Sequence, residues 1–565
     1  MQAIRQRYRK ATSTRKGRIV LLSILLLVVS AIAGGMIYWS IYKKRIIREQ
    51  LESAIRQKSK GLYNIEYDSL KLDEVAGNLS VSNFSMMYDS LRYLKLVESH
   101  QAPPSLLRIK IPEIRVTGVK TPRALIDNEI VGGTLLIRDP EIEIIYTNSG
   151  KDSARAIPTR DVYEQILGNL DMIRIDTVMI TGGRIVTKNL KTGETNIELR
   201  GTDIRLYDVA IDSVSNLDTN RILFSKKIDV ICGEVRWSSK NNLYKYGADS
   251  VELRSVSSSV SIKRFFIDPQ LKEDAFVKSL PTQDDRFDFS VSKISITGIN
   301  FPELFNEHVM ADSVIIRDAD FRIYRDLNLK RDTKNRVGTY PHQAIAKLPI
   351  PVQVSKLVII NSFIEYKERG IVSKQSGRVQ FFNARATFSN LTNDAVVIAK
   401  NNVMSLDMQT RLLNKATLKT NWRFFLDNKR GKFTVGGHLG QIADARDLNV
   451  LTEPMGPARI EEGDIKSLDF NFTGDDYGMN GTVKLIYDDL KIAVLKKDEE
   501  TKKLEKRKLI SFVANIIVKN SNPKRKGAEP RIVEVKNERD TNRSIFHLAW
   551  KTLFKGVKET VGINK

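Results

Sequence analysis

The stretch Asp312-Ser-Val-Ile-Ile-Arg-Asp-Ala-Asp-Phe-Arg-Ile-Tyr324 decides the fold class. Its apolar and polar residues alternate on both sides of Arg317-Asp318-Ala319, a short run of residues that tolerate turn geometry. Alternation with a period of two is typical of a strand with one buried face and one hydrated face. The stretch therefore predicts a hairpin, in which two antiparallel strands are joined by a tight turn.

The same pattern occurs at residues 134–146, 175–186 and 354–366, each time with turn-forming residues in the middle. A supersecondary unit that is repeated along a chain stacks into an extended sheet rather than a compact ball. The predicted fold is mainly β: a long, twisted, antiparallel sheet of repeated hairpins that covers residues 61–540. Two or three separate β-sandwiches are the alternative.

The N-terminal segment predicts a membrane anchor. Residues 19–42 carry no charge, and at ~1.5 Å per helical residue they can cross a hydrocarbon core ~30 Å thick. The run is longer than the ~7–15-residue apolar core of a cleaved signal peptide. Residues 1–18 are basic and contain no acid, which favours a cytoplasmic tail with the rest of the chain outside. Residues 43–60 are expected to continue as an amphipathic juxtamembrane helix, because apolar residues recur there every fourth position.

A second amphipathic helix is predicted at residues 541–565. Its apolar residues follow helical spacing, and lysines flank them. Aromatic residues beside lysines are typical of a helix that lies on a membrane surface, although a helix capping the open end of a sheet has the same pattern. The residues expected on the membrane surface are Phe546, Trp550, Leu553, Phe554 and Val557.

Composition restricts the function more than any motif does. The formal net charge is +24, which favours an anionic partner, and beside a membrane anchor lipid headgroups are preferred to nucleic acid. The only cysteine is Cys232, in an apolar context that predicts a buried thiol. The five histidines form no local metal motif, and no nucleotide-binding loop or nucleophile elbow is present. We therefore expect no enzyme activity, no catalytic residue, no metal and no cofactor.

The opening of the chain resembles that of AsmA-like proteins. The similarity lies in residues 51–72 and 77–86, where a helix ends near a glycine and is followed by alternating strands. Residues 463–487 look like the closing meander of that family. The resemblance implies a long sheet curled into a groove that is apolar inside and polar outside. It also implies phospholipid transport or envelope homeostasis, to which AsmA-like proteins of Gram-negative bacteria are linked, and a relation to bridge-like lipid-transfer proteins.

The resemblance implies a location as well: a single-pass protein of the inner membrane with its bulk in the periplasm. Its expected partners are membrane phospholipids and, as a second class, other envelope proteins. A non-enzymatic assembly scaffold that binds such proteins is the alternative function, and an enzyme acting on envelope glycans or lipids is a third. Inward-facing apolar residues would form a slide for acyl chains, or would pack against a helix or a second sheet. The candidates are Leu135, Ile137, Ile142, Ile144, Val178, Ile180, Ile315, Phe321, Ile323, Leu357 and Ile359.

Overall fold

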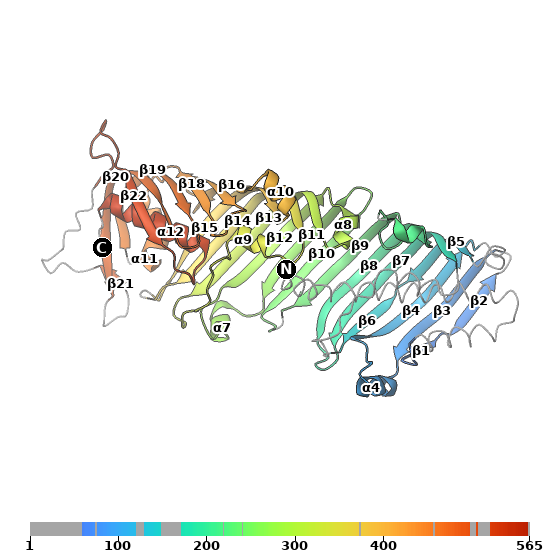
Figure 1. Cartoon of the computed structure of the whole chain (residues 1–565). Helices are drawn as coiled ribbons and strands as arrows, with labels where there is room; N and C mark the ends of the chain where they lie inside the picture. The colour runs from blue at the N-terminus through green and yellow to red at the C-terminus, as the bar shows by residue number, and fades with distance from the viewer. Residues whose placement is uncertain are drawn as a thin grey trace. The chain divides into compact units, whose positions relative to one another are not determined.

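The computed structural model confirms that the chain is mainly β (Figure 1). Its described strands pair both in parallel and antiparallel, so the sheet is mixed and not the purely antiparallel one that the sequence predicts. It describes residues 59–73, 76–119, 129–147, 171–218, 220–239, 241–371, 374–455, 458–497, 504–506 and 520–562. The predicted tail, anchor and most of the juxtamembrane helix lie outside these residues. Within the described part, no helix has the length and apolar character needed to cross a bilayer.

Two compact units make up the chain, and each is described by itself. The first comprises Met1–Ser238, Tyr246–Lys263 and Ile299–Asn306. Its elements are β1 (Tyr63–Glu66), β2 (Ser69–Asp73), β3 (Asn78–Tyr88), α4 (Ser90–Glu98), β4 (Ser105–Thr117), β5 (Glu129–Arg138), β6 (Glu141–Tyr146), β7 (Met172–Asn189), β8 (Thr195–Ile211), η1 (Ser215–Leu217), β9 (Lys227–Ser238), β10 (Tyr244–Arg254) and α8 (Phe301–Phe305).

The second unit comprises Ser239–Lys245, Arg264–Gly298 and Glu307–Lys565, and β11 (Ser259–Pro269) runs from the first unit into it. Its other elements are α7 (Glu273–Lys278), β12 (Arg286–Thr297), β13 (Val309–Asp326), α9 (Pro341–Ala346), β14 (Val352–Arg369), β15 (Ser376–Thr392), α10 (Ala395–Lys400), β16 (Val403–Leu412), β17 (Ala416–Phe425), β18 (Phe433–Leu439), η2 (Ala445–Leu448), α11 (Asn449–Met455), β19 (Ala458–Gly474), β20 (Gly478–Lys497), β21 (Leu504–Lys506), β22 (Val533–Glu538) and α12 (Ile545–Val561).

The predicted hairpins are wrong: residues 175–186, 312–324 and 354–366 each lie in one long strand with a bulge in its middle, and residues 134–146 span β5 and β6, which both run along β7. The stretch that begins at Asp312 lies wholly inside β13, and Asp318 has a φ of 52° there. Gly182 in β7 (φ 66°) and Asn361 in β14 (φ 52°) hold the equivalent places. A bulge needs a residue in the left-handed region as much as a tight turn does, so both attract Gly, Asp and Asn. Turn-forming composition alone does not separate the two structures.

The bulges of neighbouring strands line up. Asp318 and Asn361 lie side by side on the parallel strands β13 and β14, and the Asn361 amide donates to the Asp318 carboxylate at 2.6 Å. In the first unit Asp139, between β5 and β6, faces Gly182 of the parallel strand β7. The Gly182 N–H donates to the Asp203 carboxylate on β8 at 2.8 Å. Such aligned bulges bend all the strands at one level and raise their local twist.

The two units repeat the same arrangement. In the first, β5 and β6 together run parallel to β7, and β7 pairs antiparallel with β8. In the second, β13 runs parallel to β14, and β14 pairs antiparallel with β15. Ile137-Arg138-Asp139 precedes the bulge in one unit and Ile316-Arg317-Asp318 in the other. The recurring sequence pattern is therefore a duplicated group of bulged strands.

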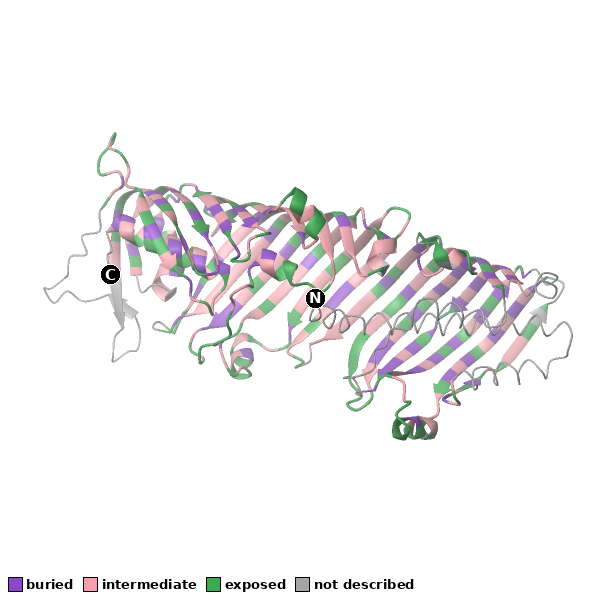
Figure 2. Ribbon diagram, viewed as in Figure 1, coloured by how far each residue is buried: buried purple, intermediate pink, exposed green. Residues whose placement is uncertain are grey.

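The apolar faces of the two units differ in how they are covered (Figure 2). In the first unit Leu79, Val116, Leu135, Val178 and Leu206 are successive cross-strand partners, and each is buried to 5% exposure or less. Cys232 is buried as well, which confirms the prediction for its thiol. In the second unit the large buried cluster lies on the strands near the C-terminus, and the other strands bury only scattered residues such as Val291 on β12.

A large core holds the C-terminal part of the second unit together. Phe433, Val435, Phe472 and Val483 from the sheet are fully buried, and α12 packs on them through Leu548 and neighbouring residues. The predicted C-terminal helix is thus confirmed, and it covers β20 and β22 on the side of the sheet turned to the viewer in Figure 1. α11 contacts both β15 and β19, which three strands separate, so the sheet curls at this point.

Candidate functional site

An apolar surface on β12 to β16 is the part of the second unit that no described element fully covers. Cross-strand register places its residues in two rows on one face, because directly paired residues point to the same side of a sheet. The first row is Ile296, Val314, Leu357, Phe388 and Leu406, and the second is Phe289, Phe321, Ile364, Phe381 and Leu412. We call these ten residues the open apolar face.

The two rows lie on the same side despite the bulges between them. β16 pairs with β17 without interruption, so Leu406 and Leu412, six residues apart, point the same way. Leu406 belongs to the first row and Leu412 to the second. The first row continues through Trp422, Val435 and Phe472 into the buried core beneath α12. One apolar surface is therefore buried over β17 to β19 and partly exposed over β12 to β16.

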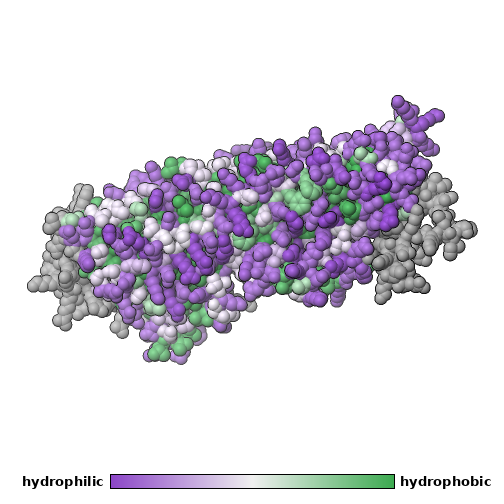
Figure 3. All heavy atoms as spheres, turned by 180° about the vertical axis from the view of Figure 1, so that it is seen from behind, coloured by the Kyte–Doolittle hydropathy of each residue, from purple (hydrophilic) through white to green (hydrophobic). Residues whose placement is uncertain are grey.

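The opposite side of the same strands is mainly polar. One residue away from the first row, the partners are Ser295, Ile315, Val358, Thr387, Asp407 and Asn421. Figure 3, which shows the chain from behind, presents a largely hydrophilic surface with hydrophobic residues interspersed. The difference between the two sides follows from the alternation that the sequence shows.

The predicted lining residues divide among three environments. Leu135, Ile137, Ile142, Ile144, Val178 and Ile180 are buried in the first unit. Phe321, Ile323, Leu357 and Ile359 are partly exposed on the open side of the second unit. Ile315 lies on the opposite, mainly polar side, because it pairs with Ser295 and Val358. The expectation that all these residues share one kind of surface missed the bulges, each of which shifts the alternation by one residue.

The helix α12 has two distinct sides. Its sheet side carries Ile545, Leu548, Thr552, Gly556 and Thr560, all buried, and a Cβ on Gly556 would come within 2.5 Å of the Val483 side chain. The helix therefore caps the sheet, as one of the two sequence interpretations expected.

The residues predicted for a membrane surface lie mostly away from the sheet. Phe546 is 63% exposed and Trp550 is 42% exposed, and Trp550 stacks on Phe554 with ring centroids 6.0 Å apart. The Phe546 ring meets Trp422 at 6.1 Å, beside the first row of the apolar surface. Leu553 and Val557 differ from these aromatic residues, since they pack against the core.

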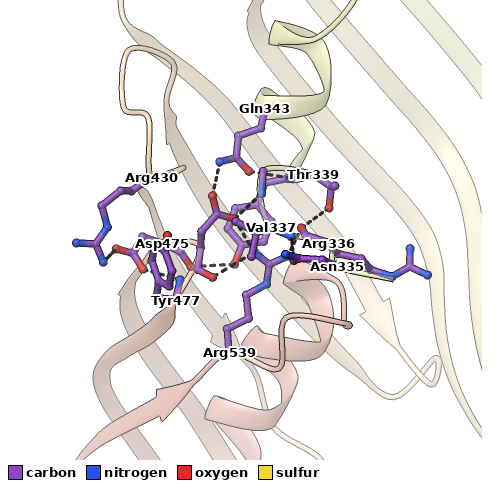
Figure 4. Close-up of polar contacts among 12 residues, drawn as sticks. Asn335, Arg336, Val337, Thr339, Gln343, Arg430, Asp475, Tyr477 and Arg539 are labelled. Carbon is purple, nitrogen blue, oxygen red and sulfur yellow. Dashed lines mark hydrogen bonds and ion pairs between the residues drawn. The ribbon is translucent and has the colours of Figure 1, made fainter. Parts of the chain in front are cut away.

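The loop between β13 and β14, residues 327–351, forms a strap that is fastened to the far strands of the second unit. Gly338 N donates to the Asp476 carboxylate at 3.0 Å, and Gln343 donates to its other oxygen at 2.6 Å. The Tyr340 hydroxyl donates to Asp475 O at 2.9 Å. Since Asp475 and Asp476 lie in the turn between β19 and β20, the strap that follows β13 is tied to that turn, and Figure 4 shows Gln343 of the strap near Asp475 and Arg539.

An ion pair lies at the centre of this attachment. Arg539 donates to the Asp476 carboxylate at 2.5 Å, and the two side chains are 1% and 3% exposed. A second guanidinium nitrogen of Arg539 donates to Arg336 O of the strap at 2.6 Å. The Arg539 guanidinium also lies 4.3 Å from the centroid of the Tyr340 ring. We call the Arg539–Asp476 pair with its strap contacts the clasp. Sequence reasoning missed it, because the two residues are far apart in the chain and neither lies in a recognisable motif.

A cavity of about 400 Å³ lies beside the clasp. His342, Gln343, Lys347, Arg430 and Asp476 are among its lining residues, and none of the predicted lining residues is. Burial lowers the pKa of His342 to about 4, and among the described residues neither of its ring nitrogens has a hydrogen-bond partner. The ring packs against Phe424 with centroids 5.2 Å apart, so this histidine acts as a neutral core residue.

The described residues contain no group of three or more histidine, cysteine, aspartate or glutamate side chains arranged to hold a metal ion. What the site offers is an apolar surface, partly open, with a helix at one end and a strap beside it. In comparisons with known proteins, no family model matches the chain and no curated protein matches it.

Proposed function

We propose that this protein handles lipids, and that the open apolar face holds acyl chains. The proposal rests on how the exposure of one apolar surface changes along the sheet. The surface is buried beneath α12 and partly exposed over β12 to β16. Soluble proteins seldom leave such a surface without a use. Five strands at ~4.8 Å spacing and about seven residues at ~3.3 Å give an area on the order of 400 Å², which is in the range of functional patches.

The energetics suit a ligand that is held without a fixed register. Burying a CH₂ group is worth ~0.8 kcal/mol, so an acyl chain of about 16 carbons would gain about 6 kcal/mol if half of its surface were covered. The surface consists of similar aliphatic and aromatic groups, and one CH₂ step along it changes little. A tail could therefore bind firmly and still slide.

The proposed setting follows the AsmA-like resemblance and the predicted anchor. The chain would sit in the inner membrane with its bulk in the periplasm and would act in phospholipid transport or envelope homeostasis. In this proposal membrane phospholipids are the partners and nucleic acid is not. An assembly scaffold that binds other envelope proteins is the alternative, and it requires no lipid on the open apolar face.

The test is the phospholipid content of the purified full-length chain after extensive washing in detergent. Wild-type protein should retain phospholipid, and Leu357→Lys should reduce the retained amount at least fivefold. Val358→Lys is the matched control, since it places the same charge on the neighbouring residue of the opposite side. Equal retention by both variants, or no lipid in wild-type protein, would favour the scaffold.

A further inference from the structure

Arg543 differs from the other arginines around it in having no acidic partner. It donates to the Gln283 side chain at 3.1 Å, and among the described residues no carboxylate forms an ion pair with it. Arg325 pairs with Asp285 at 2.6 Å, and Arg331 pairs with Asp540. A half-buried guanidinium without a counter-charge is unfavourable, so Arg543 is the cation of this region that an anion would stabilise most.

Two further basic side chains lie near Arg543. His547 and Lys551 are four residues apart on α12, and Arg543 precedes the N-cap residue Ser544, close enough for its charge to act on His547. We call these three residues the basic stripe. Burial and the positive charges of Arg543, Lys551, Arg325 and Arg331 lower the pKa of His547 to about 4. Burial and the neighbouring Arg325 and Arg331 also lower the pKa of Arg543. Glu368 acts on the pKa of Arg543 in the opposite direction, but it forms no ion pair with Arg543 among the described residues, and the arginines outweigh it.

The basic stripe lies where the open apolar face ends. Gln283, which Arg543 contacts, comes just before β12, and Phe287 and Phe289 are the first aromatic residues of that strand. Phe289 belongs to the open apolar face, and Phe287 stacks on Phe321 with ring centroids 6.2 Å apart. At ~3.3 Å per residue, the Arg543–Gln283 contact lies about 20 Å or less from Phe289 along the chain.

The aromatic side of α12 adjoins the same stripe. Trp550 and Phe554 follow His547 and Lys551 on α12 at an offset of three, so aromatic rings run next to these nitrogen-bearing side chains on the helix. Such an arrangement suits a molecule with an apolar tail and an anionic head. Guanidinium is also the side chain best matched to phosphate, because its planar fork can donate two hydrogen bonds at once.

We propose that Arg543, His547 and Lys551 form a headgroup subsite of the open apolar face, and that it binds the phosphate of an anionic lipid. The inference rests on the proposed function and adds the class of lipid to it. A tail on Phe289 and Phe321 would place its phosphate at Arg543. Neutral lipids with the same tails would lack this contact.

The experiment loads the purified full-length chain with phosphatidylglycerol or with diacylglycerol of the same acyl chains and counts bound lipid by native mass spectrometry. Wild-type protein should prefer phosphatidylglycerol at least tenfold. Arg543→Gln should lower phosphatidylglycerol loading about tenfold and leave diacylglycerol loading unchanged. Lys419→Gln, which removes a positive charge from the opposite side of the sheet, should change neither.

The outcomes separate this proposal from the proposed function. Equal loading of both lipids by wild-type protein overturns the headgroup subsite and leaves the acyl-chain surface intact. An equal loss of both lipids in Arg543→Gln overturns it too, because the residue would then be structural. No loading of either lipid contradicts the proposed function itself.

A third arm uses inorganic phosphate alone. Binding of phosphatidylglycerol should raise the pKa of His547, followed by NMR, since the lipid phosphate would offset the positive charges of Arg543, Lys551, Arg325 and Arg331. If inorganic phosphate produces the same rise and phosphatidylglycerol has no preference over diacylglycerol, the stripe binds a free anion and the lipid assignment fails.

Discussion

Removing the negative charge of the clasp should release the strap. In Asp476→Asn, the remaining carbonyl oxygen can still accept from Gly338 and Arg539, but the new amide faces Gln343 Nε2, a donor 2.6 Å from the oxygen it replaces. Gln343 cannot turn its amide over without losing the bond from Tyr340 N to its own oxygen, at 3.0 Å. The substitution therefore leaves the buried Arg539 guanidinium without a counter-charge and places two amide N–H donors, those of the new side chain and of Gln343, opposite each other.

Breaking a buried ion pair from one side costs about 3–5 kcal/mol. If that cost falls on local opening of the strap, amide exchange in residues 335–347 should accelerate by about two to three and a half orders of magnitude. Asp475→Asn is the matched control, since its partner Arg430 is 66% exposed and such pairs contribute about 1 kcal/mol or less. Hydrogen exchange measured by mass spectrometry would show that the ion pair does not hold the strap if the exchange rates of the two variants differed by less than tenfold.

Three further substitutions test the packing of α12, the bulges and the buried histidine. Gly556→Val should loosen α12 and lower the thermal midpoint by several degrees, since a Cβ would already meet the Val483 side chain at 2.5 Å, whereas Gly440→Ala, with no contact closer than 3.6 Å, should change little. Asn361→Val should lower the free energy of unfolding by about 1–2 kcal/mol, because residue 361 has a φ of 52°. Asn361→Gly should avoid the part of this loss that is due to backbone strain. Equal losses for both variants in chemical denaturation would argue against the bulge. Burial lowers the pKa of His342 from 6.5 to about 4, so below pH 6.5 the unfolded chain binds a proton that the folded chain does not. The free energy of unfolding should therefore fall by about 3 kcal/mol in total as the pH drops from 6.5 to 4. His342→Leu should therefore flatten the fall of the thermal midpoint over that window, and an unchanged slope would show that the histidine does not titrate in this way.

The sequence predicted the strand content because alternation survives in every long strand. It failed on connectivity, because Asp318 and Asn361 favour a bulge and a turn equally. Only the neighbouring strand separates the two outcomes: β13 and β14 pair in parallel on both sides of their bulges, which a tight hairpin cannot do. Parallel pairing depends on residues distant in the chain, and a local pattern does not contain it.

The candidate site was predictable to a similar degree. Alternation identified apolar positions such as Phe321 and Leu357, but one misplaced register step assigned Ile315 to the same side. The aromatic residues of α12 were found by helical spacing, whereas its sheet side was not, because small and polar residues such as Thr552 and Gly556 form it. The clasp had no local signal at all, since Arg539 and Asp476 meet only in the folded chain.

The most direct test of the central claim is photo-crosslinking from the two sides of one strand. A benzophenone amino acid would replace Phe321 or Leu357 on the open apolar face, and Ile315 or Val358 on the opposite side, in the full-length chain expressed in a Gram-negative host. After irradiation, mass spectrometry of the purified protein would count the lipid adducts. We expect phospholipid adducts at Phe321 and Leu357 and few at Ile315 and Val358. Equal labelling of both sides, or protein adducts alone on the open apolar face, would contradict it.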